Sequence, residues 1–232
     1  MAEIYHILNR GVDKRKIFFD KQDYFRFIHD LFEFNDQNLV NTTFYNFQKT
    51  QQDNQINVTG LRKINTRKQP RKLLVDIHAF CLMPNHYHLL LSPIVDSGIP
   101  RFMHKLNKGY SRYFNIKNKR KGTLFEGRYK SILINKESHF YNLPFYIHLN
   151  PLDIEFPEWR DRKLKDYNKA IEFLSNYRWS SHLDYLGKHN FPSVTNRKFL
   201  LDVFGGEEKY RENIQQWLKD MELEKVRELM LE

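Results

Sequence analysis

The chain has 232 residues, of which 41% are hydrophobic, so it can build the core of a sizeable domain. This composition excludes an intrinsically disordered protein. The net charge of +10 and the pI of about 9.5 are typical of proteins that bind nucleic acid or an anionic membrane surface. The single cysteine, Cys81, excludes a disulfide framework and a zinc site built on cysteines. Because no stretch has the pattern of a membrane span or a signal peptide, we expect a soluble, cytoplasmic protein without membrane contact.

The first part of the chain predicts three strands and one helix. Residues 4–11 read as a strand that ends at a glycine, and residues 20–34 as an amphipathic helix capped by Asp20. Residues 37–72 lose this periodicity and end in a cluster of Lys and Arg, so we expect a long basic insertion. Residues 73–84 and 86–94 are predicted strands, joined in a tight hairpin by Pro84 and Asn85.

The next elements complete a recognisable order. Residues 99–119 have helical spacing, residues 129–135 read as a strand, and a further helix ends near residue 150. This order predicts an α+β fold of the ferredoxin-like split βαβ type, with a four-stranded antiparallel sheet and helices on one face. We expect the other face to be free to carry a site. We expect residues 1–155 to form this domain and residues 156–232 to form an extension packed on it, with a long helix over 209–231.

A pair of histidines, His86 and His88, is the first candidate for chemistry. They lie two residues apart on a predicted strand, so both side chains point to one face and can bind one metal ion. A pair of hydrogen-bonded structural histidines would give the same pattern. The predicted helix that follows offers Asn107, Asn115 and His104 as a third ligand. Imidazoles with amide or water oxygens favour Mg²⁺ or Mn²⁺ over structural Zn²⁺.

The same predicted helix carries two tyrosines, Tyr110 and Tyr113. A tyrosine beside a divalent ion that holds a phosphate can attack phosphorus, although both rings could simply pack against the sheet. The basic, glycine-containing loop over 117–131 favours contacts with backbone phosphates, and aromatic residues among the cations favour unpaired bases. The cations that we expect to bind DNA in and around this loop are Arg10, Lys108, Arg112, Lys119, Arg120, Lys121, Arg128 and Lys130.

Six stretches in this order resemble the IS200-like transposase family: YHILNRG, FCLMPNHYHLLL, KGYSRYFN, KGTLFEGRYKS, YIHLNP and YRWSSHLDYLG. They resemble most closely its branch of REP-associated tyrosine transposases, which are HUH nucleases with a single catalytic tyrosine. The similarity runs through residues 4–36 and 73–188 and leaves out the insertion and the C-terminal helix.

The resemblance implies roles for individual residues. His86 and His88 match the pair that binds a divalent metal, Mg²⁺ or Mn²⁺. Tyr110 matches the nucleophile, with Tyr113 the weaker candidate, and Asn115 matches the polar residue that completes the metal shell. On an ideal helix Tyr110 and Asn115 are about 140° apart. The choice between Asn115 and Asn107 as the third ligand therefore stays open.

The function expected from this resemblance is cleavage and transfer of single-stranded DNA at hairpin-flanked sites, through a 5′-phosphotyrosine intermediate. The partner would be single-stranded or hairpin DNA, and the protein would be a monomer or a homodimer. Replication initiators and relaxases use the same chemistry, but the compact order of hairpin and then helix argues against them, and we expect no helicase-like extension. The alternative is a domesticated, non-catalytic protein that binds single-stranded or hairpin DNA.

Overall fold

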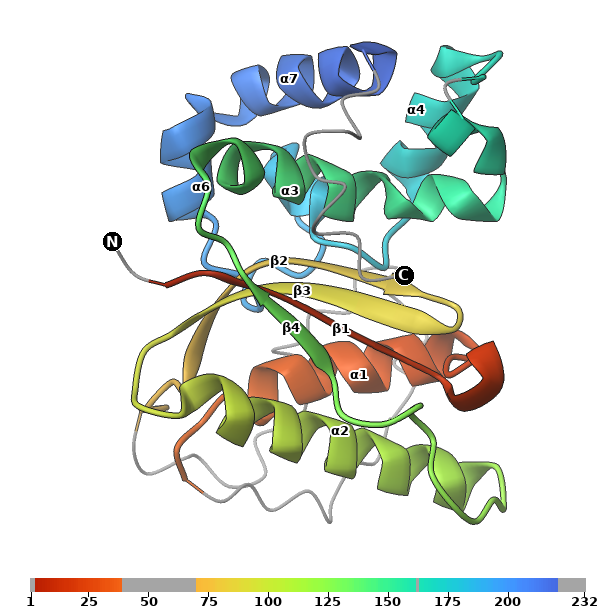
Figure 1. Ribbon diagram of the computed structural model, residues 1–232, viewed down its shortest axis with the longest axis vertical. Coiled ribbons are helices and arrows are strands. Elements are labelled where there is room, and N and C mark those ends of the chain that lie inside the picture. Colours follow the sequence, from red (N-terminus) through yellow and green to blue (C-terminus); the bar gives the residue numbers. More distant parts are fainter. Residues whose placement is uncertain (1–2, 39–69, 162, 221–232) are drawn as a thin grey trace, which may run out of the picture.

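The computed structural model describes residues 3–38, 70–161 and 163–220, so most of the predicted insertion lies outside the described residues. The first elements follow the predicted order: β1 (Tyr5–Arg10), α1 (Lys21–Glu33), β2 (Val75–Met83), β3 (His86–Pro93), α2 (Gly98–Lys117) and β4 (Lys130–Leu133). The sheet has the order β2-β3-β1-β4, and each neighbouring pair is antiparallel (Figure 1). The α+β class and the ferredoxin-like topology are therefore confirmed.

One face of the sheet is covered by α1 and α2, as predicted. The Asp20 side chain accepts a hydrogen bond from the Asp23 backbone N–H and so begins α1. The two helices cross closely at Gly109, where an added Cβ would lie 2.4 Å from the Phe34 ring. The core on this side is mainly aromatic and aliphatic: it includes Ile7, Phe27, Phe80, Tyr87, Leu89, Leu106 and Tyr110.

The opposite face is not free, which corrects the expectation of an open sheet surface. It is covered by α3 (Glu137–Leu149) and by helices from the C-terminal part of the chain (Figure 1). The core on this side includes Ala79, Cys81, Leu90, Leu143 and Ile147. The reason lies in β2, where eight of nine residues are buried. A strand that is buried on both faces has to lie between two layers.

The C-terminal part is helical, with α4 (Tyr167–Asn176), α5 (His182–Tyr185), α6 (Lys198–Phe204) and α7 (Glu207–Asp220). Three short 3-10 helices complete the described elements: η1 (Val12–Lys14), η4 (Asn150–Ile154) and η5 (Pro157–Asp161). The predicted helix over 209–231 corresponds to α7 up to Asp220, and its remainder lies outside the described residues. Across the described ranges, each helix is too short or too polar to span a membrane.

The segment over 177–188, which contains the YRWSSHLDYLG stretch, closes the outer edge of β2. The Leu82 N–H donates to the Trp179 carbonyl at 2.8 Å, and the Ser181 N–H donates to the Phe80 carbonyl at 3.0 Å. The Trp179 ring also stacks on Tyr24 of α1, with ring centroids 4.6 Å apart. This segment therefore joins the sheet edge to α1.

Candidate active site

The hairpin between β2 and β3 places His86 and His88 on the same face of the sheet, as the spacing predicted. Their ring centroids are 5.0 Å apart. Tyr87 between them points to the opposite face, where it is fully buried and packs on Phe27. His88 is fully buried under α3, whereas His86 is partly exposed at the end of the strand. His88 therefore lies between the sheet and α3, and His86 lies next to it at the partly exposed end of the strand, with the Nε2 atoms of both rings buried.

Each of these two histidines has its Nδ1 atom in a hydrogen bond. His86 Nδ1 lies 2.7 Å from Asn85 Oδ1, and since that oxygen only accepts, His86 carries its proton on Nδ1 and its lone pair on Nε2. His88 Nδ1 lies 2.9 Å from Nε2 of His6, a buried β1 residue whose ring stacks on that of His88. Such partners orient metal-binding imidazoles in known proteins. His6 was missed in the sequence, where only its strand alternation could have indicated it.

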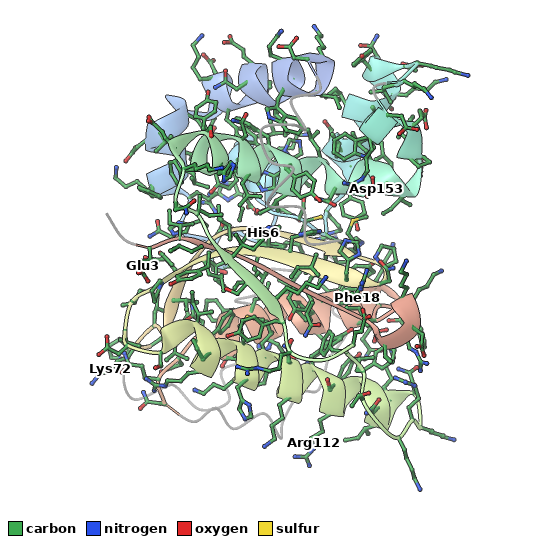
Figure 2. All side chains as sticks on the ribbon, in the orientation of Figure 1. Glu3, His6, Phe18, Lys72, Arg112 and Asp153 are labelled. Atoms are coloured by element: carbon green, nitrogen blue, oxygen red, sulfur yellow. The ribbon has the colours of Figure 1, made fainter. Side chains whose placement is uncertain are left out.

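Tyr110 is not brought to the histidines. It lies on α2, on the other side of the sheet, and its hydroxyl donates to the Ile17 carbonyl at 2.6 Å. Burial, together with the negative charge of Asp23, holds the pKa of Tyr110 well above its ordinary value. Tyr113 lies in the same layer and donates to Asp23 Oδ1 at 3.0 Å. Figure 2 shows the labelled residue Arg112 of α2 below the sheet, in this layer. The geometry therefore does not support either tyrosine as a partner of His86 and His88.

The two predicted third ligands lie in that layer as well. The Asn115 side chain donates to the Gly122 carbonyl at 2.9 Å and accepts from Arg120 at 3.3 Å. Asn107 Oδ1 accepts the hydroxyl of Tyr87 at 2.6 Å. Both amides thus have structural partners around α2 and are separated from the histidines by the sheet.

A different tyrosine, Tyr146 of α3, lies against the histidines. Its ring centroid is 5.9 Å from that of His88 and 6.4 Å from that of His6, and it meets both rings edge-on. Asn150 follows one helical turn later, on the same side of the helix, and its side-chain amide donates to the Tyr146 carbonyl at 2.9 Å. Both residues are fully buried. The signal in the sequence was the four-residue spacing of tyrosine and asparagine in YIHLNP.

Arg160 of η5 adds a cation to this arrangement. Its guanidinium donates to the Tyr146 hydroxyl at 3.4 Å and to Asn150 Oδ1 at 3.0 Å. Asp153 of η4 accepts two further hydrogen bonds from the same group, at 2.7 and 2.6 Å. No sequence pattern indicated Arg160, because it lies in an irregular segment without a clear period.

The predicted DNA-binding cations fall into two groups. Arg10 lies opposite His86 in the β1–β3 register, and Lys130 lies opposite Leu8, which is itself opposite His88. Directly paired residues of antiparallel strands share a face, so these two cations lie on the histidine side. The other six lie on α2 or in the segment between α2 and β4: Lys108, Arg112, Lys119, Arg120, Lys121 and Arg128.

The segment before β4 follows β1 past the histidine end of the sheet. Phe125 bridges to Gly11, and the Glu126 N–H donates to the Arg10 carbonyl at 2.9 Å. The side chains of Arg10 and Glu126 also form an ion pair. The middle of the KGTLFEGRYKS stretch is therefore held beside His86.

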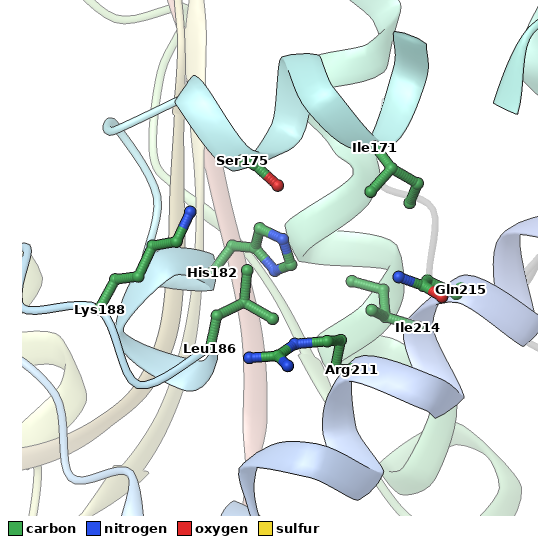
Figure 3. A pocket seen from close by; sticks show the side chains of 8 residues that line it. All are labelled: Ile171, Ser175, His182, Leu186, Lys188, Arg211, Ile214 and Gln215. Atoms are coloured by element: carbon green, nitrogen blue, oxygen red, sulfur yellow. The ribbon is translucent and has the colours of Figure 1, made fainter. Parts of the chain in front are cut away.

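The donor set is compatible with a divalent metal. The described residues contain no group of three or more His, Cys, Asp or Glu that could hold an ion. His86 and His88 offer imidazole nitrogens and Asn150 offers an amide oxygen, and nitrogen and oxygen donors of these types can hold a divalent ion with water in the remaining positions. A pocket between α4, α5 and α7 shares none of these residues; His182 contributes to its lining (Figure 3).

Comparison with known proteins supports the resemblance seen in the motifs. The family model described as "Transposase IS200 like" matches residues 59–150, which confirms the predicted resemblance over residues 73–150 and begins inside the predicted insertion. No curated protein matches the chain. Among solved structures, the chain is similar to a REP-associated tyrosine transposase bound to a REP hairpin. That similarity has a TM-score of 0.46 and 12% identity, and it covers 83% of this chain and 84% of the other.

Proposed function

We propose that this protein is a transposase that cleaves and transfers single-stranded DNA, with Tyr146 as the nucleophile in place of Tyr110. The observation that carries the proposal is the position of Tyr146, whose ring lies 5.9 Å from that of His88 on the same side of the sheet. The match of residues 59–150 to IS200-like transposases supports the reaction class. The REP hairpin bound by the similar solved structure supports hairpin DNA as the substrate class.

His86, His88 and Asn150 are the residues that would hold a divalent metal, Mg²⁺ or Mn²⁺. Such an ion supplies positive charge that stabilises the charge building up on the oxygens of the scissile phosphate. The chain itself contributes the orientation of the ligands. Asn85 and His6 fix the imidazoles through Nδ1, and the one-turn spacing on α3 keeps Asn150 beside Tyr146.

The covalent step is a transfer between oxygen atoms on phosphorus. The Tyr146 hydroxyl loses its proton as its oxygen bonds to phosphorus, and the bond to the 3′ oxygen breaks, which releases a 3′ hydroxyl and leaves a 5′-phosphotyrosine. The 3′ hydroxyl of a second strand then attacks the same phosphorus and releases Tyr146. No ATP is needed, because the intermediate conserves the phosphodiester bond energy.

We place the DNA strand at the partly exposed His86 end of the sheet. Arg10 lies beside His86, and the segment over 124–130 follows β1 at this edge, so cations are available for the phosphates on either side of the cleavage point. Tyr146 and His88 are fully buried, so the phosphate has to displace side chains at this edge before it reaches the tyrosine.

The test uses single-stranded hairpin oligonucleotides taken from the DNA that flanks the gene, with and without Mn²⁺. We expect a protein–DNA adduct on a denaturing gel that requires Mn²⁺, disappears in Tyr146→Phe and persists in Tyr110→Phe. An adduct that persists in Tyr146→Phe would overturn the assignment of the nucleophile.

The complete burial of Tyr146 and His88 favours a second candidate, a non-catalytic protein that binds hairpin DNA. This candidate predicts tight hairpin binding that is independent of metal, and no adduct from any tyrosine. The same gel, combined with a binding measurement, separates the two functions.

A further inference from the structure

We infer that Arg160 is a positioning residue for strand cleavage, because it holds the Tyr146 oxygen and the Asn150 amide oxygen with one guanidinium group. The inference rests on the proposed function and adds a residue to it. Nη1 donates to the Tyr146 hydroxyl at 3.4 Å, and Nη2 donates to Asn150 Oδ1 at 3.0 Å. Arg160 therefore connects the proposed nucleophile to a proposed metal ligand.

The position of the guanidinium is itself fixed by Asp153. Nε and Nη2 of Arg160 donate to the two carboxylate oxygens of Asp153, at 2.7 and 2.6 Å, in the bidentate geometry that suits arginine. The Trp159 indole N–H donates to one of the same carboxylate oxygens at 2.6 Å. About a quarter of each side chain in the ion pair is exposed (25% for Arg160, 23% for Asp153), so solvent screens it only in part.

Ring contacts hold the plane of the guanidinium. Its central carbon lies 5.5 Å from the centroid of the Tyr146 ring and 5.1 Å from that of Trp159. The group is thus held by residues of α3, η4 and η5, three consecutive elements of the chain. A lysine at this position keeps the charge, but its compact ammonium cannot reach all of these partners in one plane.

The contacts give Arg160 two effects on the reaction. Its N–H beside the Tyr146 oxygen stabilises the negative charge that develops on this oxygen as the hydroxyl loses its proton. The same N–H stabilises the charge that returns to this oxygen when the bond between Tyr146 and phosphorus breaks. Its N–H on Asn150 Oδ1, together with the hydrogen bond from the Asn150 amide nitrogen to the Tyr146 carbonyl, fixes the orientation of the amide that would supply the oxygen ligand. Groups of this kind, which orient a metal ligand, typically change metal affinity by about 10–100-fold when they are removed.

The experiment compares Arg160→Lys with Arg178→Lys in the full chain. Arg178 is a suitable control because its guanidinium also packs on aromatic rings, at 5.0 Å from Phe25 and 5.4 Å from Trp179, but at the β2 edge. Three quantities are measured: the single-turnover rate of adduct formation, the Kd for the hairpin, and the Kd for Mn²⁺ from the electron paramagnetic resonance signal of the free ion. Asp153→Asn serves as a second variant that leaves Arg160 in place.

In Arg160→Lys we expect the adduct rate to fall at least about 10-fold and the Mn²⁺ Kd to rise by about 10–100-fold. The hairpin Kd should stay within about twofold, because the charge is kept. Asp153→Asn should shift the rate and the Mn²⁺ Kd in the same direction, and Arg178→Lys should change neither. A purely structural role would instead lower thermal stability equally in the two lysine variants, with the Mn²⁺ Kd unchanged.

The outcomes separate this inference from the proposed function. If Arg160→Lys keeps the rate and the Mn²⁺ affinity of the unmodified protein while Tyr146→Phe blocks the adduct, the role of Arg160 is refuted and the proposed function stands. If the unmodified protein forms no adduct but binds Mn²⁺ in a way that depends on Arg160, the proposed nuclease is refuted and the link from Arg160 to Asn150 is supported. If it neither forms an adduct nor binds Mn²⁺, both are refuted.

Discussion

Replacing Tyr210 by phenylalanine removes a hydroxyl that two buried histidines share. The Tyr210 oxygen lies 2.8 Å from His148 Nδ1 and 2.7 Å from His182 Nδ1, and all three side chains are buried. A hydroxyl has one proton and two lone pairs, so it can donate to one imidazole and accept from the other. His148 lies between Tyr146 and Asn150 in the sequence of α3, so this contact ties the helix that carries the proposed site to α7.

The expected cost follows from the groups left behind. Phenylalanine fills nearly the same volume, so water does not enter, and two imidazole nitrogens lose their partner. Each buried polar group without a hydrogen bond costs about 1–3 kcal/mol, so for two such groups the free energy of unfolding should fall by about 2–6 kcal/mol. This is a large part of the ~5–15 kcal/mol that stabilises a typical domain.

Equilibrium urea denaturation measures the change. Tyr141→Phe is the matched control, because Tyr141 is exposed and accepts one hydrogen bond from Asn213. The control should lie within about 0.5 kcal/mol of the unmodified protein. A loss in Tyr210→Phe no larger than that of the control would show that the hydroxyl does not hold the two histidines.

Three further changes have a defined sign. Burial lowers the pKa of His182 to about 3 from 6.5, so below pH 6.5 the unfolded chain binds a proton that the folded chain does not. As the pH falls below 6.5, the free energy of unfolding should then decrease by up to about 1.4 kcal/mol per pH unit. Between pH 6.5 and 4, the free energy of unfolding of His182→Asn should depend less on pH than that of the unmodified protein. Gly109→Ala gains about 1 kcal/mol of helix propensity, but its added methyl group would clash with the Phe34 ring, so the substitution should destabilise the protein. In a Phe34→Ala background, where the ring is absent, the same substitution should stabilise the protein. Lys117→Met removes the ammonium that lies 2.6 Å from the buried Asp23 carboxylate, so the free energy of unfolding should fall by about 3 kcal/mol. An unchanged urea midpoint would show that this ion pair does not stabilise the fold.

The sequence was sufficient to predict the order of strands and helices. Each of these elements has a clear period or a clear terminus, such as the Asp20 cap of α1 and the two-residue turn before His86. The shared face of His86 and His88 also followed from the strand period alone. Local patterns of this kind do not depend on the tertiary arrangement.

The partners of the histidines could not be predicted in the same way. The alternation of side chains along a strand places Tyr87 on one face of the sheet and His86 and His88 on the other. It does not indicate which of these two faces is covered by α1 and α2. Tyr110 was predicted as the nucleophile from the family resemblance, on the helix that follows the hairpin in the chain. That helix packs on the Tyr87 side of the sheet. α3 is buried at nine of its thirteen positions, so no amphipathic pattern indicates which side of it faces the histidines. The proximity of Tyr146 to His88 depends on packing between segments far apart in the sequence.

Tyr146 carries the DNA in the covalent intermediate that we propose, and peptide mass spectrometry of the trapped adduct tests this most directly. The protein would be incubated with a hairpin oligonucleotide and Mn²⁺, digested with protease and nuclease, and searched for a nucleotide-modified tyrosine. We expect the modification on Tyr146, in the peptide that contains YIHLNP. A modification on Tyr110 or Tyr113 would contradict the site described between the sheet and α3.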